Sequence, residues 1–80
     1  MRDDKQEKQE FNAYLGKRVK TTRLKLGLTR EQLAELARVS DKFIYDIEVG
    51  KKGVSAWVLV KIAMALGVSM DWLAGDAGSI

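Results

Sequence analysis

Residues 29–48 read TREQLAELARVSDKFIYDIE and carry the start signals of two short helices. Thr29 and Gln32 have the spacing of a capping box, in which the hydroxyl accepts from the backbone N–H three residues on and the glutamine side chain reaches back. Ser40 is a good N-cap for a second helix that begins at the next residue. The first helix must then end near Arg38, which leaves a turn of about three residues between the two.

Two short helices joined by so tight a turn must cross closely, so the residue at which they meet has to be small. Ala34 occupies that place, and Leu36 is expected on the inner side of the same helix. Val39 in the turn, with Ile44 and Ile47 in the second helix, would fix the crossing angle. The segment therefore predicts a rigid helix-turn-helix unit.

The chain on both sides of this unit is also predicted to be helical, because it lacks proline and its apolar residues recur at helical spacing. A first helix over residues 11–26 would end at Gly27. Ser55 caps a helix that ends at Gly67, and Ser69 caps a short last helix. The sequence therefore predicts an all-α fold of five helices around one core.

The length of 80 residues, 46% of them hydrophobic, leaves room for one domain. We expect this domain to span residues 11–75, with residues 1–10 as a charged, disordered N-terminal arm and residues 76–80 as a short unstructured tail. No apolar run approaches the roughly twenty residues that span a bilayer, and the charged start does not resemble a signal peptide. We therefore expect a cytoplasmic protein without a membrane partner.

The chain contains no cysteine and no histidine, which removes the common ligands of metal clusters, thiol chemistry and imidazole bases. Asp41 and Asp46 are paired carboxylates, but on a helix surface they would lack the buried cavity that acid–base catalysis requires. We expect no enzyme, and we expect neither a metal, a cofactor nor a small-molecule ligand.

Positive charge is unevenly distributed along a chain whose net charge is +3. Residues 11–26 carry five bases and no acid, and Lys51 and Lys52 form a basic linker. Residues 27–52, which hold the central unit and the basic linker, carry five bases and five acids, so this stretch is expected to be electrically neutral overall. This mild basic bias permits a nucleic-acid partner without establishing one.

The central unit and its flanks resemble the Xre family, the Cro and C1-type phage repressors. The runs that carry the resemblance are Leu28–Ala37, Val39–Ser40, Ile47–Glu48 and Gly50–Lys51, with Leu15–Val19 upstream and Ala65–Ser69 downstream. The likeness covers roughly residues 11–75. It implies a compact five-helix, lambda-repressor-like domain that binds a specific sequence of double-stranded DNA through the major groove.

In that family the second helix of the unit enters the major groove, while the first turn of the first helix and the following linker meet phosphates. The residues that the resemblance implicates in DNA contact are Thr29, Arg30, Ser40, Asp41, Lys42, Tyr45, Asp46, Lys51 and Lys52.

The resemblance suggests different roles for these residues. Arg30 matches a family position that touches phosphate, and the free N–H groups beside it would bind the same anion. Lys42 is expected to donate to guanine O6 or N7. Tyr45 could contact a base edge, a thymine methyl or a phosphate. Asp41 and Asp46 depart from the uncharged or basic residues that are frequent at these positions. We interpret them as selectivity elements that accept a hydrogen bond from cytosine N4. Asp41 has an alternative interpretation, as an acidic residue at the helix start that the helix dipole favours.

Two further features are compared with the family pattern, one ion pair and one turn residue. Arg23 and Glu48 match positions that pair across helices and would fix the second helix of the unit against its scaffold. Arg38 stands where the family usually has glycine. If its backbone is left-handed, the side chain costs on the order of 1 kcal/mol, and an approach to phosphate could repay part of it.

Trp57, Val60 and Met64 lie on the side of their helix where polar residues are expected. An apolar stripe on a small domain often marks a partner surface. We predict that this stripe, with Trp72 of the last helix, forms a homodimer contact. Two copies would read a pseudo-palindromic operator with half-sites about one turn apart.

The sequence thus favours a small transcriptional regulator, a repressor that acts by occupying its operator. The alternative is an antitoxin or another protein-interaction module that uses the same domain. Such antitoxins usually add a segment for their toxin, and only the residues outside 11–75 are spare for that task.

Overall fold

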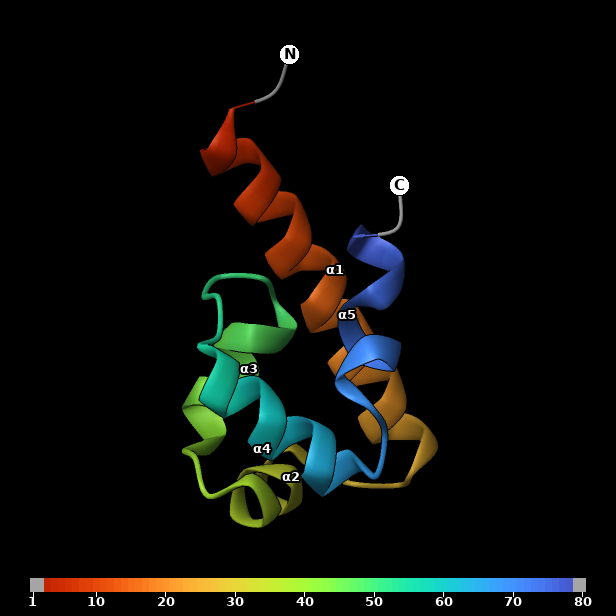
Figure 1. Cartoon of the computed structure of the whole chain (residues 1–80). Coiled ribbons are helices and arrows are strands. Elements are labelled where there is room, and N and C mark those ends of the chain that lie inside the picture. Colours follow the sequence, from red (N-terminus) through yellow and green to blue (C-terminus); the bar gives the residue numbers. More distant parts are fainter. Residues whose placement is uncertain (1–2, 79–80) are drawn as a thin grey trace.

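The computed structural model describes residues 3–78, and of residues 76–78 the backbone alone. Its five helices are α1 (Asp4–Lys25), α2 (Arg30–Ala37), α3 (Asp41–Glu48), α4 (Ala56–Leu66) and α5 (Met70–Gly78) (Figure 1). Residues 3–78 contain no strand. The predicted all-α, five-helix fold is confirmed.

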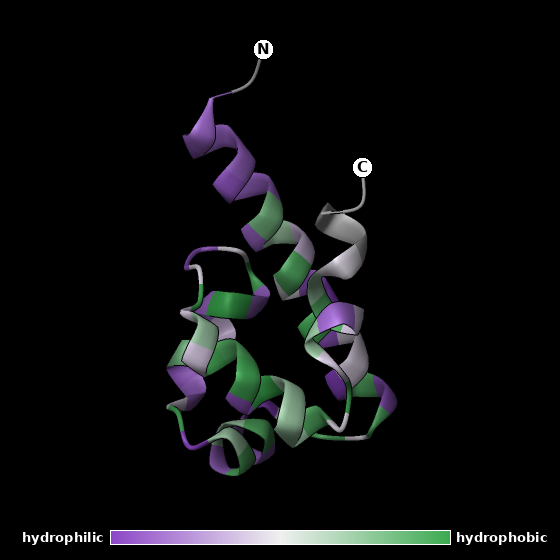
Figure 2. Cartoon of the chain, viewed as in Figure 1, coloured by the Kyte–Doolittle hydropathy of each residue, from purple (hydrophilic) through white to green (hydrophobic). Residues whose placement is uncertain are grey.

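The helices enclose one core. α1 packs against α3 and α5, α2 packs against α3 and α4, and α4 also meets α5. Figure 2 shows the apolar residues concentrated where these helices meet and the amino-terminal half of α1 almost wholly hydrophilic. The buried apolar side chains are Leu15, Val19, Leu33, Ala34, Ala37, Ile44, Ile47, Ile62, Ala63, Leu66 and Leu73.

The predicted caps define the ends of the central helices. The Thr29 hydroxyl accepts from the backbone N–H of Gln32 at 3.0 Å, and the Gln32 side chain accepts from the backbone N–H of Thr29 at 2.8 Å. The Ser40 and Ser55 hydroxyls each accept from the N–H three residues on, at 3.0 and 3.2 Å. Gly67 ends α4 in the left-handed conformation, with φ 71°. These local signals mark the starts of α2, α3 and α4 and the end of α4.

The prediction of a disordered arm over residues 1–10 is wrong for residues 4–10, which form the first turns of α1. Asp3 caps the helix. Its carboxylate accepts from the backbone N–H of Gln6 at 2.8 Å, and the Gln6 side-chain oxygen accepts from the backbone N–H of Asp3 at 3.1 Å. Turns added to a helix that is already nucleated by its packed half avoid the nucleation cost. Residues 1–2 lie outside the described part.

The predicted tail is also shorter than expected, because α5 continues past Gly75 to Gly78. The helix starts at the predicted cap, where Ser69 accepts from the backbone N–H of Trp72 at 2.9 Å. No proline follows to stop it. Residues 79–80 lie outside the described part.

α1 and α3 touch through their backbones at Gly16. A Cβ atom built on this residue would lie 2.1 Å from the carbonyl oxygen of Ile47 and 2.8 Å from that of Glu48. Only glycine permits an approach this close. The position of α3 is therefore fixed by α1 as well as by the turn after α2.

Arg38 ends α2 in the left-handed conformation, with φ 58° and ψ 46°. The turn is closed by bonds from the N–H of Arg38 to the carbonyl of Glu35 at 3.3 Å and from Val39 to Ala34 at 3.0 Å. A side chain in this conformation costs roughly 1 kcal/mol. The conditional expectation of a left-handed residue here is confirmed.

None of the helices within residues 3–78 is long and apolar enough to cross a membrane.

Candidate nucleic-acid interface

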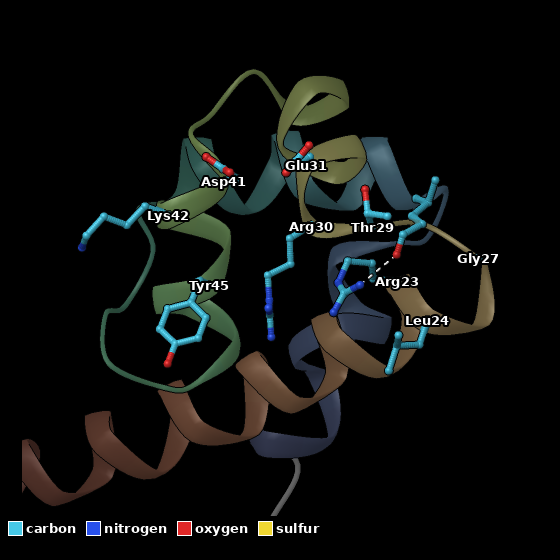
Figure 3. Close-up of a pocket in the computed structure, with 10 residues that line it drawn as sticks. Arg23, Leu24, Gly27, Thr29, Arg30, Glu31, Asp41, Lys42 and Tyr45 are labelled. Atoms are coloured by element: carbon cyan, nitrogen blue, oxygen red, sulfur yellow. Dashed lines mark hydrogen bonds between the residues drawn. The ribbon is translucent and has the colours of Figure 1, made fainter.

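The outer face of α3 presents the exposed residues Asp41, Lys42 and Tyr45, preceded by the cap Ser40 and followed by Val49. Positions 41, 42, 45 and 49 follow the helical repeat and form one stripe. Figure 3 shows Lys42 pointing away from the domain and Tyr45 facing Arg30 of α2. Four of the predicted base-reading residues thus share one accessible face.

Beside this stripe lies an open hollow of about 770 Å³, which we call the α2–α3 hollow. Its walls come from the start of α2, the outer face of α3 and the end of α1 (Figure 3). Thr29, Arg30, Lys42 and Tyr45 line it. Asp41 lines it as well, whereas Ser40, Lys51 and Lys52 do not, so part of the predicted phosphate-binding and base-reading set borders one concave surface.

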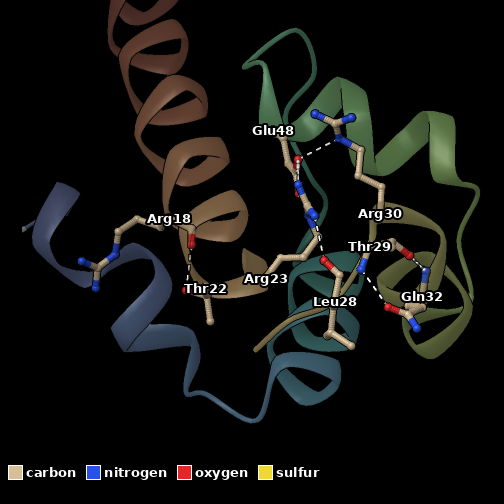
Figure 4. Close-up of polar contacts among 8 residues, drawn as sticks. All are labelled: Arg18, Thr22, Arg23, Leu28, Thr29, Arg30, Gln32 and Glu48. Carbon is tan, nitrogen blue, oxygen red and sulfur yellow. Dashed lines mark hydrogen bonds and ion pairs between the residues drawn. The ribbon is translucent and has the colours of Figure 1, made fainter. Parts of the chain in front are cut away.

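Glu48 stands behind this hollow and binds two arginines (Figure 4). Arg23 donates through Nε to one carboxylate oxygen at 2.6 Å and through a terminal nitrogen to the other at 3.1 Å. Arg30 donates through Nε at 2.9 Å. The predicted pair of Arg23 with Glu48 is confirmed, and Arg30 is a third member that the sequence did not suggest.

The two arginines differ in what they have left to offer. Arg23 is buried and also donates to the carbonyl of Leu28 at 2.8 Å, so each of its three guanidinium nitrogens makes a hydrogen bond. Arg30 keeps 37% of its side chain exposed and, within residues 3–78, bonds only through Nε. Its guanidinium also lies 5.1 Å from the ring centre of Tyr45. One carboxylate between two guanidiniums leaves a net charge of +1. The partly exposed Arg30 presents this charge, because its two terminal nitrogens are not bonded to Glu48.

Asp46 is not on the reading face, contrary to the sequence-based expectation. Its side chain is 2% exposed and lies 3.2 Å from the ammonium of Lys42 and 3.5 Å from that of Lys52. The chain turns back after α3 at the left-handed Gly50, with the N–H of Lys51 donating to the carbonyl of Asp46 at 2.9 Å. Asp46 therefore pairs with two cations and is not part of the exposed stripe of α3.

The hydrogen bond from Lys42 lowers the pKa of the Asp46 carboxyl below its ordinary value of 3.8. Burial opposes this shift, while the charges of Lys42, Lys52 and Lys51 add to it. A carboxyl whose pKa is lower in the folded protein stabilises the fold above its ordinary pKa and loses that contribution as the pH falls through the folded value.

We therefore expect Asp46→Asn to reduce stability at neutral pH and to flatten its dependence on pH below 3.8, the ordinary pKa of the group. Denaturant midpoints measured across an acid pH series check this. Asp41→Asn is the matched control, because Asp41 is exposed on the same helix. An unchanged acid limb in Asp46→Asn would show that this carboxylate contributes no charge-dependent stability.

The basic linker is held against α1. A Cβ atom at Gly53 would lie 3.0 Å from the side-chain oxygen of Asn12, and one at Gly50, where φ is 76°, would lie 3.1 Å from the Cα of Ala13. Lys51 and Lys52 are both exposed. Two cations are thus displayed on a segment that packs closely on the scaffold.

The four predicted dimer-contact residues do not behave alike. Trp57 and Met64 are exposed, whereas Val60 is half-buried. Trp72 is partly exposed, but the guanidinium of Arg18 lies 3.8 Å from its ring centre and donates to its carbonyl. Arg18 therefore ties α5 to α1, and Trp72 is in part a structural residue.

Sequence reasoning missed two residues that shape this interface. Val49 extends the exposed stripe of α3, and no feature of its local sequence distinguishes it from a core residue. Gly16 did carry a signal, since a glycine inside a helical pattern suggests a close backbone approach.

A tightly turned pair of helices, with an exposed second helix flanked by cations, defines a helix-turn-helix domain. The profile of the helix-turn-helix family matches residues 19–73. The chain belongs to this family, in its Xre, Cro and C1-type branch.

Curated relatives agree with this assignment. The chain is similar to an uncharacterized HTH-type transcriptional regulator of Rickettsia conorii, with 34% identity over 64 residues, which are 80% of this chain and 51% of the relative. It is also similar to the immunity repressor protein of Bacillus phage phi105, with 36% identity over 62 residues, 78% of this chain and 43% of the relative. The chain thus spans about half the length of these relatives.

Solved structures share the fold. The clp gene regulator ClgR from Corynebacterium glutamicum superposes with a TM-score of 0.80 and 32% identity, over 85% of this chain and 72% of that one. The restriction-modification controller protein C.AhdI from Aeromonas hydrophila gives a TM-score of 0.76 and 29% identity, over 78% of this chain and 94% of that one.

Proposed function

We propose that this chain binds a specific site in double-stranded DNA through the major groove and regulates transcription from that site as a repressor. The observation that carries the proposal is the exposed stripe of α3, bordered on each side by a carboxylate that holds two cations, Glu48 and Asp46. Relatives named as a transcriptional regulator and an immunity repressor support it.

Phosphate contacts would position the domain on the duplex. Arg30 offers its two terminal nitrogens beside the N-terminus of α2, where Thr29 caps the helix and free N–H groups favour an anion. Lys51 and Lys52 would hold the backbone on the other side of α3. The Arg30 guanidinium is already oriented by Glu48 and Tyr45, so little of its conformational freedom is left to lose on binding.

Base contacts would come from the exposed stripe. Lys42 can donate to guanine O6 or N7, and its departure would leave Asp46 still paired with Lys52. Tyr45 and Val49 offer apolar contact with a thymine methyl. Asp41 can accept from cytosine N4.

We expect Arg30→Ala to weaken binding to all duplexes similarly and to reduce the salt slope of the affinity by about one, because a phosphate contact is lost.

Lys42→Ala should instead relax the preference at one base pair, by about 1–3 kcal/mol. Fluorescence anisotropy over a salt series, with labelled specific and unrelated duplexes, measures both. Lys25→Ala is the control, since Lys25 is exposed and does not line the α2–α3 hollow. An Arg30→Ala protein with an unchanged salt slope would contradict the assigned role.

One such domain reads only a few base pairs, so we also propose a homodimer on a pseudo-palindromic operator, with half-sites about 34 Å apart. Its contact is best supported on α5, where Met70 and Trp72 are exposed side chains of a helix that packs on α1 and α4. Trp57 and Met64 were predicted as part of this contact, but they border a separate hollow between α2 and α4. We therefore leave them out of the proposed dimer contact.

A protein-interaction role remains the second candidate. The observation that favours it is that separate hollow, beside exposed apolar side chains of α2 and α4.

A further inference from the structure

A second hollow of about 620 Å³ lies between α2 and α4; we call it the α2–α4 hollow. It is lined by Leu36, Ala37 and Arg38 from the end of α2 and by Trp57, Lys61 and Met64 from α4. It shares no lining residue with the α2–α3 hollow. A ligand here would therefore not occupy the groove-facing surface.

Three large apolar side chains border this hollow and are mostly in solvent: Leu36 is 58% exposed, Trp57 67% and Met64 76%. Leu36 was expected inside, but Leu33 and Ala37 take the inward positions of α2. Trp57 and Met64 lie two turns apart on the face of α4 opposite its buried residues. A contiguous exposed apolar patch on a small domain marks an interaction surface.

The charges at the hollow have one sign. Arg38 and Lys61 are cations, and no lining residue is acidic. The ammonium of Lys61 donates to the carbonyl of Arg38 at 3.3 Å, which holds both residues at the same rim. Arg38 keeps its long side chain at a left-handed position where glycine would be unstrained. Two copies meeting here around a two-fold axis would face each other with the same cations, whereas an acidic partner would neutralise them.

We propose that the α2–α4 hollow binds an acidic, amphipathic segment of a partner protein. Apolar side chains of that segment would cover Leu36, Trp57 and Met64, while its carboxylates would pair with Arg38 and Lys61. An amphipathic helix laid in a hydrophobic groove is the recognition mode that fits these features. The site goes beyond the proposed DNA function, because both surfaces can be occupied at once.

Selection from a displayed library of random short peptides against the full chain tests this proposal. We expect enriched peptides to be net negative, with large apolar residues at helical spacing. A synthetic copy of an enriched peptide should lose at least tenfold in affinity for Trp57→Glu. The double variant Arg38→Glu/Lys61→Glu should enrich net positive peptides instead. Leu26→Glu is the matched control, because Leu26 is also largely exposed, at 52%, but lines neither hollow.

Enrichment of neutral or basic peptides by the wild type, no enrichment above that given by Trp57→Glu, or unchanged charge selection by the double variant would each overturn the proposal. Self-association of the wild type that Trp57→Glu abolishes would also overturn it, by assigning the surface to a second copy. Circular dichroism confirms that each variant is folded. Binding of Trp57→Glu to duplex DNA should equal that of the wild type, so failure of this site is distinguishable from failure of the DNA-binding proposal.

Discussion

Gly16→Ala is expected to lower the free energy of unfolding by about 3 kcal/mol, the upper end of what overpacking usually costs. The added Cβ would lie 2.1 Å from the carbonyl oxygen of Ile47, a backbone atom that cannot rotate away. Relief requires α1 and α3 to separate, which would also displace the exposed stripe of α3. Chemical denaturation followed by circular dichroism measures the change, and duplex binding should weaken in parallel.

Gly75→Ala is the matched control, since it makes the same substitution in α5, where the nearest atom to the new Cβ is 4.0 Å away. Alanine is the better helix former, so this variant should be as stable as the wild type or more so, by up to about 1 kcal/mol. If Gly16→Ala and Gly75→Ala had equal stability, the close contact between α1 and α3 would not exist in solution.

Glu48→Gln is expected to destabilise the fold by about 3 kcal/mol or more, because it leaves a buried guanidinium without its counter-charge. The side chain of Arg23 is only 7% exposed, whereas that of Arg30 is 37% exposed and can be hydrated. The lost free energy of unfolding therefore comes from the ion pair of Arg23 and Glu48, which joins α3 to α1. Thermal and chemical denaturation measure it.

Glu35→Gln removes the same charge from an exposed position of α2 and should change stability by less than about 0.5 kcal/mol. A Glu48→Gln protein as stable as this control would mean that the buried cluster contributes no stability. In that case Arg23 and Glu48 would matter for geometry alone.

The electrostatics of the central unit differ from what its sequence suggests. The equal numbers of acids and bases in residues 27–52 predict a neutral segment, yet Asp46 and Glu48 are both buried and each lies between two cations. Asp41 is then the one acid on the exposed stripe of α3. Both buried carboxylates are thus paired with cations, and the acids that line the α2–α3 hollow are Asp41 and Glu31.

Local features were predictable because short-range hydrogen bonds determine them. Thr29, Ser40 and Ser55 start their helices as expected, and the pairing of Arg23 with Glu48 followed from the family resemblance. Features that depend on distant packing were not predictable. Arg30 and Glu48 are 18 residues apart, and no spacing in the sequence indicates that Arg30 joins the pair of Arg23 and Glu48.

The ends of the chain were predicted wrongly for a related reason. Polarity suggested a disordered arm, but a polar helix needs no core of its own once its neighbour in sequence is packed. The capping box of Asp3 and Gln6 was present in the sequence and indicates the start of α1. Leu36 shows the opposite error, since an apolar residue at helical spacing is not necessarily inside.

Selection of bound sites from random duplex DNA tests the central claim most directly. The chain should enrich one short motif, arranged as two inverted half-sites about one helical turn apart. Lys42→Ala should then enrich the same motif with one position degenerate, while Arg30→Ala should enrich it unchanged but more weakly. Failure of the wild type to enrich any sequence, at low as well as moderate salt, would contradict the account.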